Sequence, residues 1–212
     1  MVNKIMVGID EAGRGSWAGP VVAAVFGFDP KFNDNLDVIR KLKDSKKLSA
    51  KKRKEISEEL KNLKKEKKVY FGIGEASSKI IDKINIRNAN KMAMERAISN
   101  FFLSMSEENI SKILVDGNDN YKFKNTSLKT EYIIRGDDLV DEIKAASIIA
   151  KVYRDELMVE LGKKYKKHFF GIHKGYGTKK HQLALDEFGV TPIHRKSYKP
   201  IKNRLISGGF SI

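Results

Sequence analysis

Two acidic residues stand side by side near the start of the chain, Asp10 and Glu11, directly after an apolar stretch from Ile5 to Ile9. The alternation of residues in that stretch predicts a short buried strand. On a continuing strand the two carboxylates would point to opposite faces, whereas Glu11 can turn to join Asp10 if the strand stops there. Carboxylates that close repel, and one stays protonated unless a cation lies between them. A divalent metal is the simplest such cation, and a charged turn is the alternative interpretation.

A turn of glycine, arginine and glycine follows, Gly13 to Gly15. Successive backbone N–H groups lie exposed there beside the Arg14 side chain, because glycine has no Cβ to cover them. This arrangement is typical of a concavity for a phosphate or a ribose hydroxyl.

Two further acids occupy comparable positions. Asp116 ends the apolar stretch Ile113 to Val115, and Asp137 lies just before a helix predicted from residue 141 to about residue 161, where the helix dipole favours a carboxylate. An aspartate before glycine is also a common turn former. With no cysteine and no histidine spacing typical of a metal site, the four acids predict an oxygen-ligand site for Mg²⁺ or Mn²⁺. Two such ions about 4 Å apart are the usual device for cutting a phosphodiester.

The elements that must position these acids follow from periodicity and from breaker residues. The 212 residues suffice for one domain with a core, and no repeat or low-complexity linker divides them. The expected strands are 5–10, 21–28, 69–73, 113–116 and 131–134, with the second strand hairpinned to the first. The expected helices are 50–63 with Ser49 as N-cap, 84–105, 141–161 and 179–188.

The net charge of +15 is concentrated in two parts of the chain. Residues 40–68 carry a net charge of +9 and residues 162–204 a net charge of +10, while the segments before and between them are slightly acidic. Basic segments on either side of an acidic middle suit a polyanion held against a metal-binding centre, so nucleic acid is the expected partner. Solvated lysine-rich surfaces are the alternative.

Composition excludes several classes of protein. The chain contains no cysteine, which excludes a disulfide framework and a thiolate zinc site. No run approaches the ~18 apolar residues of a membrane helix, and the first predicted strand begins too early to leave room for a signal peptide. A cytoplasmic protein is therefore expected.

The C-terminal part mixes aromatic, glycine and basic residues, from His168 to Thr178. Aromatic rings between cations suit stacking and phosphate contacts on a nucleic acid, although each ring taken singly is better explained as core. Tyr176 is the exception, since the glycines on either side of it are expected to leave its ring exposed. The four histidines match no spacing of metal ligands.

Eight short stretches of the chain form a pattern when they are taken together. They are Asp10-Glu11-Ala12-Gly13-Arg14-Gly15, Ala18-Gly19-Pro20-Val21-Val22, Asp44-Ser45-Lys46-Lys47-Leu48-Ser49, Val115-Asp116-Gly117, Gly136-Asp137, Ala145-Ala146-Ser147-Ile148-Ile149-Ala150-Lys151, Gly175-Tyr176-Gly177-Thr178 and His194-Arg195-Lys196-Ser197-Tyr198. In order and spacing the pattern resembles the bacterial-type ribonuclease HII family over about residues 4–200. Any one stretch alone would be weak.

The resemblance implies an α/β protein with a ribonuclease H-like fold. That fold is a mixed five-stranded sheet flanked by helices, with a catalytic domain in residues 1–161 and a C-terminal helical cap in residues 162–212. The implied activity is hydrolysis of the RNA strand of RNA–DNA hybrids, and incision 5′ of ribonucleotides embedded in duplex DNA. The products would carry a 3′-hydroxyl and a 5′-phosphate, and two Mg²⁺ or Mn²⁺ ions would act in the catalytic state.

The same resemblance implies roles for particular residues. The catalytic, metal-binding acids of the family fall on Asp10, Glu11, Asp116 and Asp137. The substrate-binding positions fall on Gly13, Arg14 and Gly15 for the 2′-hydroxyl side of the RNA–DNA junction, and on Tyr176 for the next deoxyribose. Lys46 and Lys47 are expected to bind the duplex for a different reason, since they lie in the basic segment 40–68.

Two features depart from the family's pattern. Ser16-Trp17 stands where members usually have Pro-Leu, so the loop after the glycines is expected to differ in shape. Asp138 makes the fourth acid ambiguous, although Gly136 favours Asp137. Ribonuclease HIII is rejected, because its members usually have Gly-Lys-Gly at the turn and an N-terminal substrate-binding domain that four residues before the first strand cannot supply.

Expectations about partners follow from the same resemblance. RNA–DNA hybrids and DNA duplexes that contain ribonucleotides are the expected substrates, and the chain is expected to be a monomer with no membrane association. Residues 203–212 contain no clear sliding-clamp motif. The rival hypothesis is a basic hybrid-binding protein without catalysis, and metal-dependent cleavage distinguishes the two.

Overall fold

Five strands form one mixed sheet in the computed structural model, which describes residues 4–30, 40–42 and 48–207. The strand order is β3-β2-β1-β4-β5; β1 and β3 run antiparallel to β2, and β4 runs parallel to both β1 and β5. The mixed five-stranded sheet and its β1–β2 hairpin confirm the expectation from the sequence. The strands are β1 (Ile5–Ala12), β2 (Val21–Phe28), β3 (Val69–Ala76), β4 (Ile110–Asp116) and β5 (Thr130–Ile133).

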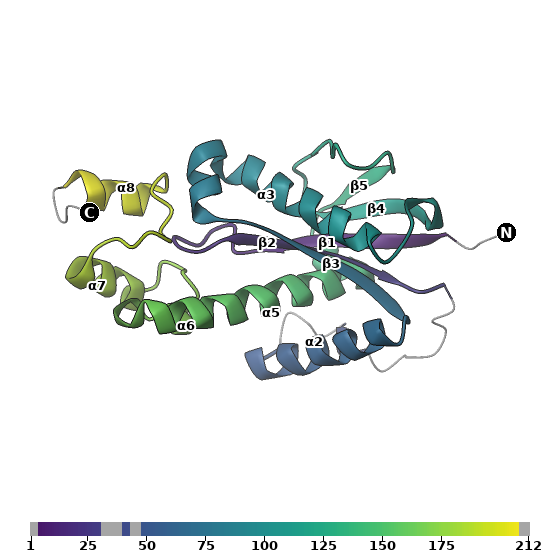
Figure 1. Cartoon of the computed structure of the whole chain (residues 1–212), viewed down its shortest axis with the longest axis horizontal. Coiled ribbons are helices and arrows are strands. Elements are labelled where there is room, and N and C mark those ends of the chain that lie inside the picture. The colour runs from purple at the N-terminus through teal and green to yellow at the C-terminus, as the bar shows by residue number, and fades with distance from the viewer. Residues whose placement is uncertain (1–3, 31–39, 43–47, 208–212) are drawn as a thin grey trace.

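Helices cover both faces of this sheet (Figure 1). α3 (Ser78–Phe102) packs on one face, whereas α2 (Ala50–Lys65) and α5 (Asp141–Lys164) pack on the other. The fold therefore has two apolar layers, one on each side of the sheet. None of the helices in the described ranges is long and apolar enough to cross a membrane.

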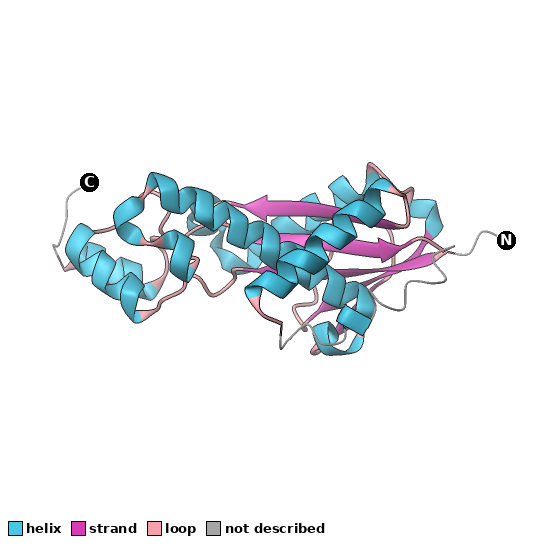
Figure 2. Ribbon diagram, turned by 90° about the horizontal axis from the view of Figure 1, so that it is seen from below, coloured by secondary structure: helices cyan, strands magenta, loops and turns pink. Residues whose placement is uncertain are grey.

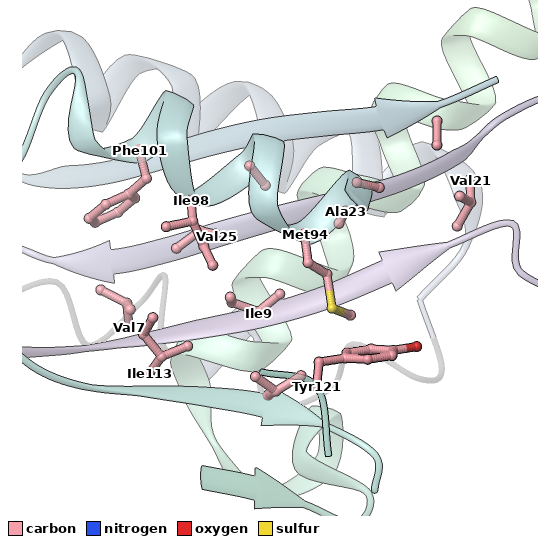
Figure 3. Close-up of a cluster of buried hydrophobic side chains, with 14 of the residues drawn as sticks. Val7, Ile9, Val21, Ala23, Val25, Met94, Ile98, Phe101, Ile113 and Tyr121 are labelled. Carbon is pink, nitrogen blue, oxygen red and sulfur yellow. The ribbon is translucent and has the colours of Figure 1, made fainter. Parts of the chain in front are cut away.

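Each layer depends on close contact between a helix and the strands. On the α3 face, Met94, Ile98 and Phe101 point onto the sheet (Figure 3). On the opposite face α5 approaches the sheet so closely that a Cβ on Gly8 would lie 2.3 Å from the backbone nitrogen of Ile143. The central strands are thereby buried on both sides and hold their ends in fixed positions.

Side-chain caps explain where α2 and α3 begin. The Ser49 side chain accepts a hydrogen bond from the backbone N–H of Lys52 at 3.2 Å, as its predicted role as N-cap requires. α3 starts earlier than the expected residue 84, because Ser77 caps a first helical segment. Asn85, with a φ of 64°, then interrupts the helix, and its side chain accepts from the N–H of Asn88 at 3.0 Å. The sequence pattern identified only the segment after this kink.

The C-terminal residues form a cap at the end of the molecule far from the N-terminus (Figure 1). This cap contains α6 (Phe170–His173), α7 (Lys179–Phe188) and α8 (Lys199–Ile206), of which α7 has its predicted bounds and α8 was not predicted. Seen from below, helices continue from the sheet into the cap (Figure 2). The predicted domain boundary after residue 161 falls inside α5, so the division into two domains stays a prediction.

Candidate active site

Four acidic side chains lie at one edge of the sheet. Asp10 and Glu11 are near the end of β1, and Asp116 is the last residue of β4. Asp137 lies in a short helix that follows β5, α4 (Gly136–Leu139). Because β1, β4 and β5 are parallel, their carboxyl ends meet at the same edge, and loops at such an edge commonly carry functional residues. We call these four residues the acidic edge.

The strand does not stop at Asp10. Glu11 pairs with Ala23 of β2 and Asp10 with Ala24, so both residues belong to the ladder and their side chains alternate. Asp10 lies beside Ser147 on the α5 side of the sheet, and Glu11 lies beside Asn90 on the α3 side, and each of these polar side chains lowers the pKa of the carboxylate next to it. The possibility that Glu11 turns to join Asp10 is therefore wrong.

The charge of Asp116 raises the pKa of both Asp10 and Glu11, although these two side chains lie on opposite faces of the sheet. Burial is the main cause that raises the pKa of Asp10 well above its usual value, and the charges of Glu11 and Asp116 raise it further. Burial also raises the pKa of Glu11 and of Asp116, and Asp116 adds to the shift of Glu11. These groups are thus like charges at close range in a poorly solvated site, where a cation stabilises their ionised forms.

Asp137, and not Asp138, faces the acidic edge. The backbone N–H of Asp137 donates to Asp116 Oδ1 at 3.3 Å, and the Asp137 side chain lines a cavity together with Glu11. Asp138 forms an ion pair with Arg135, whose guanidinium Nε donates to Asp138 Oδ2 at 3.0 Å. This arrangement supports Asp137 as the fourth acid of the predicted site.

The donors at the acidic edge suit a hard divalent cation. All of its side-chain donors are carboxylate oxygens, which Mg²⁺ and Mn²⁺ prefer. The amide oxygen of the fully buried Asn90, beside Glu11, has no hydrogen-bond partner among the described residues, so a polar atom of the site is left for a ligand or its water. As they are placed, no three His, Asp or Glu side chains in the described ranges stand close enough together to hold a metal ion.

The two glycines of the glycine turn next to the acids differ in conformation and in surroundings. Gly13 has a φ of +88°, and a Cβ on it would overlap the Arg154 side chain at 1.8 Å. Gly15 has an ordinary φ, and a Cβ there would meet no atom within 4 Å. Packing therefore requires glycine at position 13, whereas the space beside Gly15 is open for a ligand to approach the backbone.

Arg14 is held in place between acidic side chains. Its guanidinium donates twice to Asp119, once at 3.1 Å to Oδ1, and lies 3.6 Å from Glu11 Oε1. The fork of Arg14 matches the carboxylate of Asp119, and this pairing lowers the pKa of Asp119. The loop after β4 thus orients the arginine of the glycine turn.

Two buried arginines anchor the loop between β1 and β2. Arg154 of α5 and Arg195 before α8 are both fully buried, and burial lowers the pKa of each. Their bonds tie the loop to the cap. Nothing in the sequence pattern singled out Arg154, and Arg195 was named only within a stretch that carries the family resemblance. Arg154 donates to the oxygens of Ser16, Ala18, Pro20 and Lys174, and Arg195 to those of Gly13, Arg14, Gly19 and Tyr198.

The ring of Tyr176 is half-buried, and cations lie against it. The Lys151 ammonium and the Arg154 guanidinium are 5.5 Å and 5.4 Å from the ring centroid. The flanking glycines do not serve to expose the ring, as the sequence suggested. A Cβ on Gly175 would lie 2.4 Å from the carbonyl oxygen of Ala18, and one on Gly177 would lie 2.2 Å from the Trp17 ring.

One cavity of about 260 Å³ joins these features. Acidic side chains, the start of the glycine turn and Tyr176 all line it, as do three polar residues that the sequence analysis had not assigned to the site. The lining residues are Glu11, Ala12, Gly13, Arg53, Asp137, Ser147, Ile148, Lys151 and Tyr176. Ser147 and Lys151 belong to a stretch that carried the family resemblance, which was the available signal for them.

The comparison with known families identifies the class of this site. The family model described as Ribonuclease HII matches residues 7–201. The chain belongs to the ribonuclease HII family. Its catalytic class is accordingly that of a ribonuclease H endonuclease.

Relatives in this family and solved structures share the fold. The ribonuclease HII of Coxiella burnetii (strain Dugway 5J108-111) is 42% identical over 201 residues, which cover 94% of this chain and 91% of the relative. The ribonuclease HII in a PCNA complex from Archaeoglobus fulgidus superposes with a TM-score of 0.71 at 26% identity, covering 92% of this chain and 95% of that one. A Bst-RNase HIII in complex with Mn²⁺ shares the fold, with a TM-score of 0.74 at 15% identity, over 97% of this chain and 70% of that one.

One pair of predicted ribonuclease HII site residues is not located. Lys46 and Lys47 lie outside the described residues. The other eight predicted residues lie around the cavity and the acidic edge: Asp10, Glu11, Gly13, Arg14, Gly15, Asp116, Asp137 and Tyr176.

Proposed function

We propose that this ribonuclease HII family member hydrolyses the RNA strand of RNA–DNA hybrids and incises 5′ of ribonucleotides embedded in duplex DNA. The products carry a 3′-hydroxyl and a 5′-phosphate. The observation that carries the proposal is the cavity that joins Glu11 and Asp137 to Gly13 and Tyr176. Catalytic carboxylates and the surfaces suited to two successive sugars thereby face one space.

The acidic edge is the proposed metal site of this reaction. Asp10, Glu11, Asp116 and Asp137 would hold Mg²⁺ or Mn²⁺, with two ions in the catalytic state. When bound, such a pair activates water and stabilises the leaving oxygen of a phosphodiester. The raised pKa values of Asp10, Glu11 and Asp116 support this proposal, because a cation at close range favours the ionised carboxylates.

The glycine turn and Tyr176 are proposed to bind two successive sugars of the substrate strand, a ribose and the deoxyribose after it. Open space beside Gly15 lets a ribose approach the backbone, and Arg14 adds a charged donor beside it. A deoxyribose next in the strand presents a face without a hydroxyl, which suits the ring of Tyr176. The two surfaces together would accept one 2′-hydroxyl and reject a second.

Basic residues are proposed to bind the duplex backbone. Arg53 of α2 lines the cavity, and further lysines on α2 and in the cap carry the charge excess of the two basic segments. Lys46 and Lys47 are proposed to contribute from the segment before α2. A binding protein without catalysis is the weaker hypothesis, because four acids facing a polyanion oppose binding unless a cation offsets them.

The setting of the enzyme is also a proposal. We expect a cytoplasmic monomer that acts on hybrids and on duplexes with embedded ribonucleotides. The Archaeoglobus fulgidus relative forms a complex with PCNA. For this chain, residues 203–212 contain no clear clamp motif, so a sliding clamp is left out of the proposed partners.

The deciding experiment uses a duplex that contains a single ribonucleotide. It is incubated with the protein in the presence of Mg²⁺, Mn²⁺ or a chelator, and the ends of the products are determined. We expect cleavage 5′ of the ribonucleotide with either metal and none with the chelator. Binding without cleavage in every metal would instead favour the hybrid-binding hypothesis.

A further inference from the structure

Trp17 lies in the loop that follows the glycine turn, where the family resemblance led us to expect Pro-Leu. It is the only tryptophan of the chain and is half-buried. Its backbone N–H donates to the carbonyl oxygen of Gly175 at 2.7 Å, and its own carbonyl accepts from the N–H of Arg195 at 2.8 Å. The second residue after the glycine turn is thus bonded directly to the residue just before Tyr176.

The indole of Trp17 also supports the residue after Tyr176. Gly177 lies against the ring so closely that a Cβ on it would be 2.2 Å from Cζ2 of the indole. No side chain larger than hydrogen fits at Gly177 while the indole is there. Trp17 therefore contacts the backbone on both sides of Tyr176.

Histidines beneath Trp17 hold the carbonyl of Tyr176. The His181 ring lies 5.5 Å from the indole, centroid to centroid. Since the N–H of Thr191 donates to His194 Nδ1 at 2.8 Å, His194 carries its proton on Nε2 and donates to His181 Nε2 at 3.0 Å. The Nδ1–H of His181 is then left to donate to the Tyr176 carbonyl at 3.0 Å.

The neighbouring Ser16 stiffens the same connection. Its hydroxyl donates to the carbonyl of Gly13 at 2.8 Å and accepts from Arg154 at 2.6 Å. Arg154 in turn lies over the Tyr176 ring. The glycine turn is thereby fixed to the cation that contacts the ring, while Trp17 fixes the backbone that carries it.

We propose that Trp17 is a positioning residue for substrate selectivity, which holds the glycine turn and Tyr176 at a fixed separation. The inference rests on the proposed function, in which these two surfaces read successive sugars. Selectivity for a single ribonucleotide requires both surfaces to fit at once, whereas a long hybrid offers many registers in which hydrolysis can occur. Loosening the connection therefore weakens incision at a single ribonucleotide more than cleavage of a long hybrid.

The main test compares Trp17→Leu with Trp17→Phe. Leucine keeps apolar bulk but leaves a gap beside Gly177, whereas phenylalanine keeps a ring there. The measured quantity is kcat/KM on a single-ribonucleotide duplex divided by kcat/KM on a long hybrid. We expect this ratio to fall about tenfold in Trp17→Leu, since small misplacements near reacting groups have effects of that order or larger, and to recover in Trp17→Phe.

A matched control excludes a general loss of packing. Phe102 is a half-buried aromatic residue in the last turn of α3, within the sheet layer and not at the site. Phe102→Leu should leave the ratio unchanged even if it lowers the melting temperature. Equal losses on both substrates in Trp17→Leu would reduce Trp17 to a packing residue and overturn the inference.

A double variant tests whether Trp17 acts through Tyr176. In the Tyr176→Ala background, Trp17→Leu should change the ratio no further, because the group that it positions is gone. A full additional tenfold fall would show that Trp17 acts on the substrate independently of Tyr176, which also overturns the inference.

Fluorescence of the wild-type protein supplies a readout that needs no folded variant. In a chelator, a duplex with one ribonucleotide should change the Trp17 emission at saturation more than an all-DNA duplex of the same sequence. Identical changes would contradict the proposed coupling. A wild type that cleaves neither substrate would refute the proposed function and this inference together, whereas a selective wild type with unaffected Trp17 variants refutes the inference alone.

Discussion

Two groups of titratable side chains lie next to Tyr176, and they are built in opposite ways. The acidic edge gathers carboxylates at strand ends, and burial and mutual repulsion raise the pKa of Asp10. The histidine cluster in the cap, defined as His168, His173, His181 and His194, gathers rings that bond to one another and to backbone groups. The acids retain unfavourable like charges, whereas the histidines are connected by ring contacts and by hydrogen bonds.

This difference indicates that the acids form a ligand site and that the histidines stabilise the packing of the cap. Buried polar groups that satisfy one another stabilise one packing arrangement, as the stacked rings of His173 and His181 at 4.2 Å do around Phe170. Like charges held together without compensation destabilise the fold and persist where a ligand offsets them. The comparison predicts that removing an acid destroys activity and spares stability, and that disturbing the histidines mainly lowers stability.

The largest effect is expected from Asp10→Asn and Asp116→Asn. Each should lower the cleavage rate about 10³-fold or more, since charge stabilisation in such sites is worth at least that order. Binding of the uncleaved duplex should remain, and the melting temperature should not fall, because like-charge repulsion is relieved. Cleavage assays, binding titrations and thermal melts measure the three quantities.

Asp137 and Asp138 provide a matched pair for this prediction. Asp137→Asn should behave like Asp10→Asn, whereas Asp138→Asn removes a carboxylate that forms an ion pair with Arg135 and should retain near-wild-type cleavage. A rate close to wild type for Asp10→Asn, or the opposite order for the adjacent pair, would refute the assignment of the acidic edge.

The next effect concerns Tyr176, which lies between the two groups. Tyr176→Ala should lose incision at a single ribonucleotide by about 10- to 100-fold and retain more activity on a long hybrid, partly rescued by Mn²⁺, because the acids remain. The ratio of the two rates in one preparation and one salt measures this effect. Tyr153→Ala, an exposed tyrosine on the same helix as Arg154, is the control, and equal losses on both substrates would make Tyr176 a packing residue.

The histidine cluster and the acidic edge should change the free energy of unfolding in opposite directions when the pH is lowered. Burial lowers the pKa of His194 to about 3 and of His181 to about 4. In the unfolded chain a histidine has a pKa of about 6.5, so below that pH the unfolded state binds more protons than the folded state. The free energy of unfolding should therefore fall as the pH falls, by roughly 2 kcal/mol for one such histidine between pH 7 and pH 5. Urea titrations at the two pH values measure this loss.

Two variants separate the contributions of the histidines and the acids to this loss of stability. His194→Gln should remove part of the loss between pH 7 and pH 5. The raised pKa of Asp10 acts oppositely, because the folded state then binds more protons and gains stability as the pH falls. Asp10→Asn should therefore steepen the loss, and a pH-independent free energy of unfolding in the wild type would contradict the lowered pKa values of His181 and His194.

The smallest effect is expected from the basic residues outside both groups. Affinity for the duplex should fall log-linearly with salt, and each lysine or arginine that contacts a phosphate adds about 0.9 to the slope. Replacing Lys46 and Lys47 by glutamine should make the slope shallower by up to about two, and Arg53→Gln by about one. Unchanged slopes would leave these residues as contributors to solubility only.

Residues whose role is local could be predicted from the sequence. The alternation before Asp10, the apolar run of β2 and the Ser49 cap each depend on neighbours within a few positions, and the structure has all three. Acids that end apolar stretches mark strand ends in the same local way. The family resemblance added the connection between these distant stretches, which periodicity alone does not supply.

The tertiary structure decided what each of these residues contacts. Whether β1 continues through Glu11 depended on its pairing with Ala23, which is twelve positions away along the chain but adjacent in the sheet. The need for glycine at positions 13, 175 and 177 arises from Arg154, Ala18 and Trp17, which belong to other segments. Such close approaches leave no periodic signal, because they depend on how distant backbones pass one another.

The histidines show the same limit most clearly. Their spacing along the chain matched no metal site, and in isolation it predicted nothing else. Folding of the cap brings all four together around Phe170 and connects them to the carbonyl of Tyr176. Residue types and local spacing therefore determined which chemistry the chain carries, and long-range packing determined which groups are compensated and which are left for a substrate or a cation.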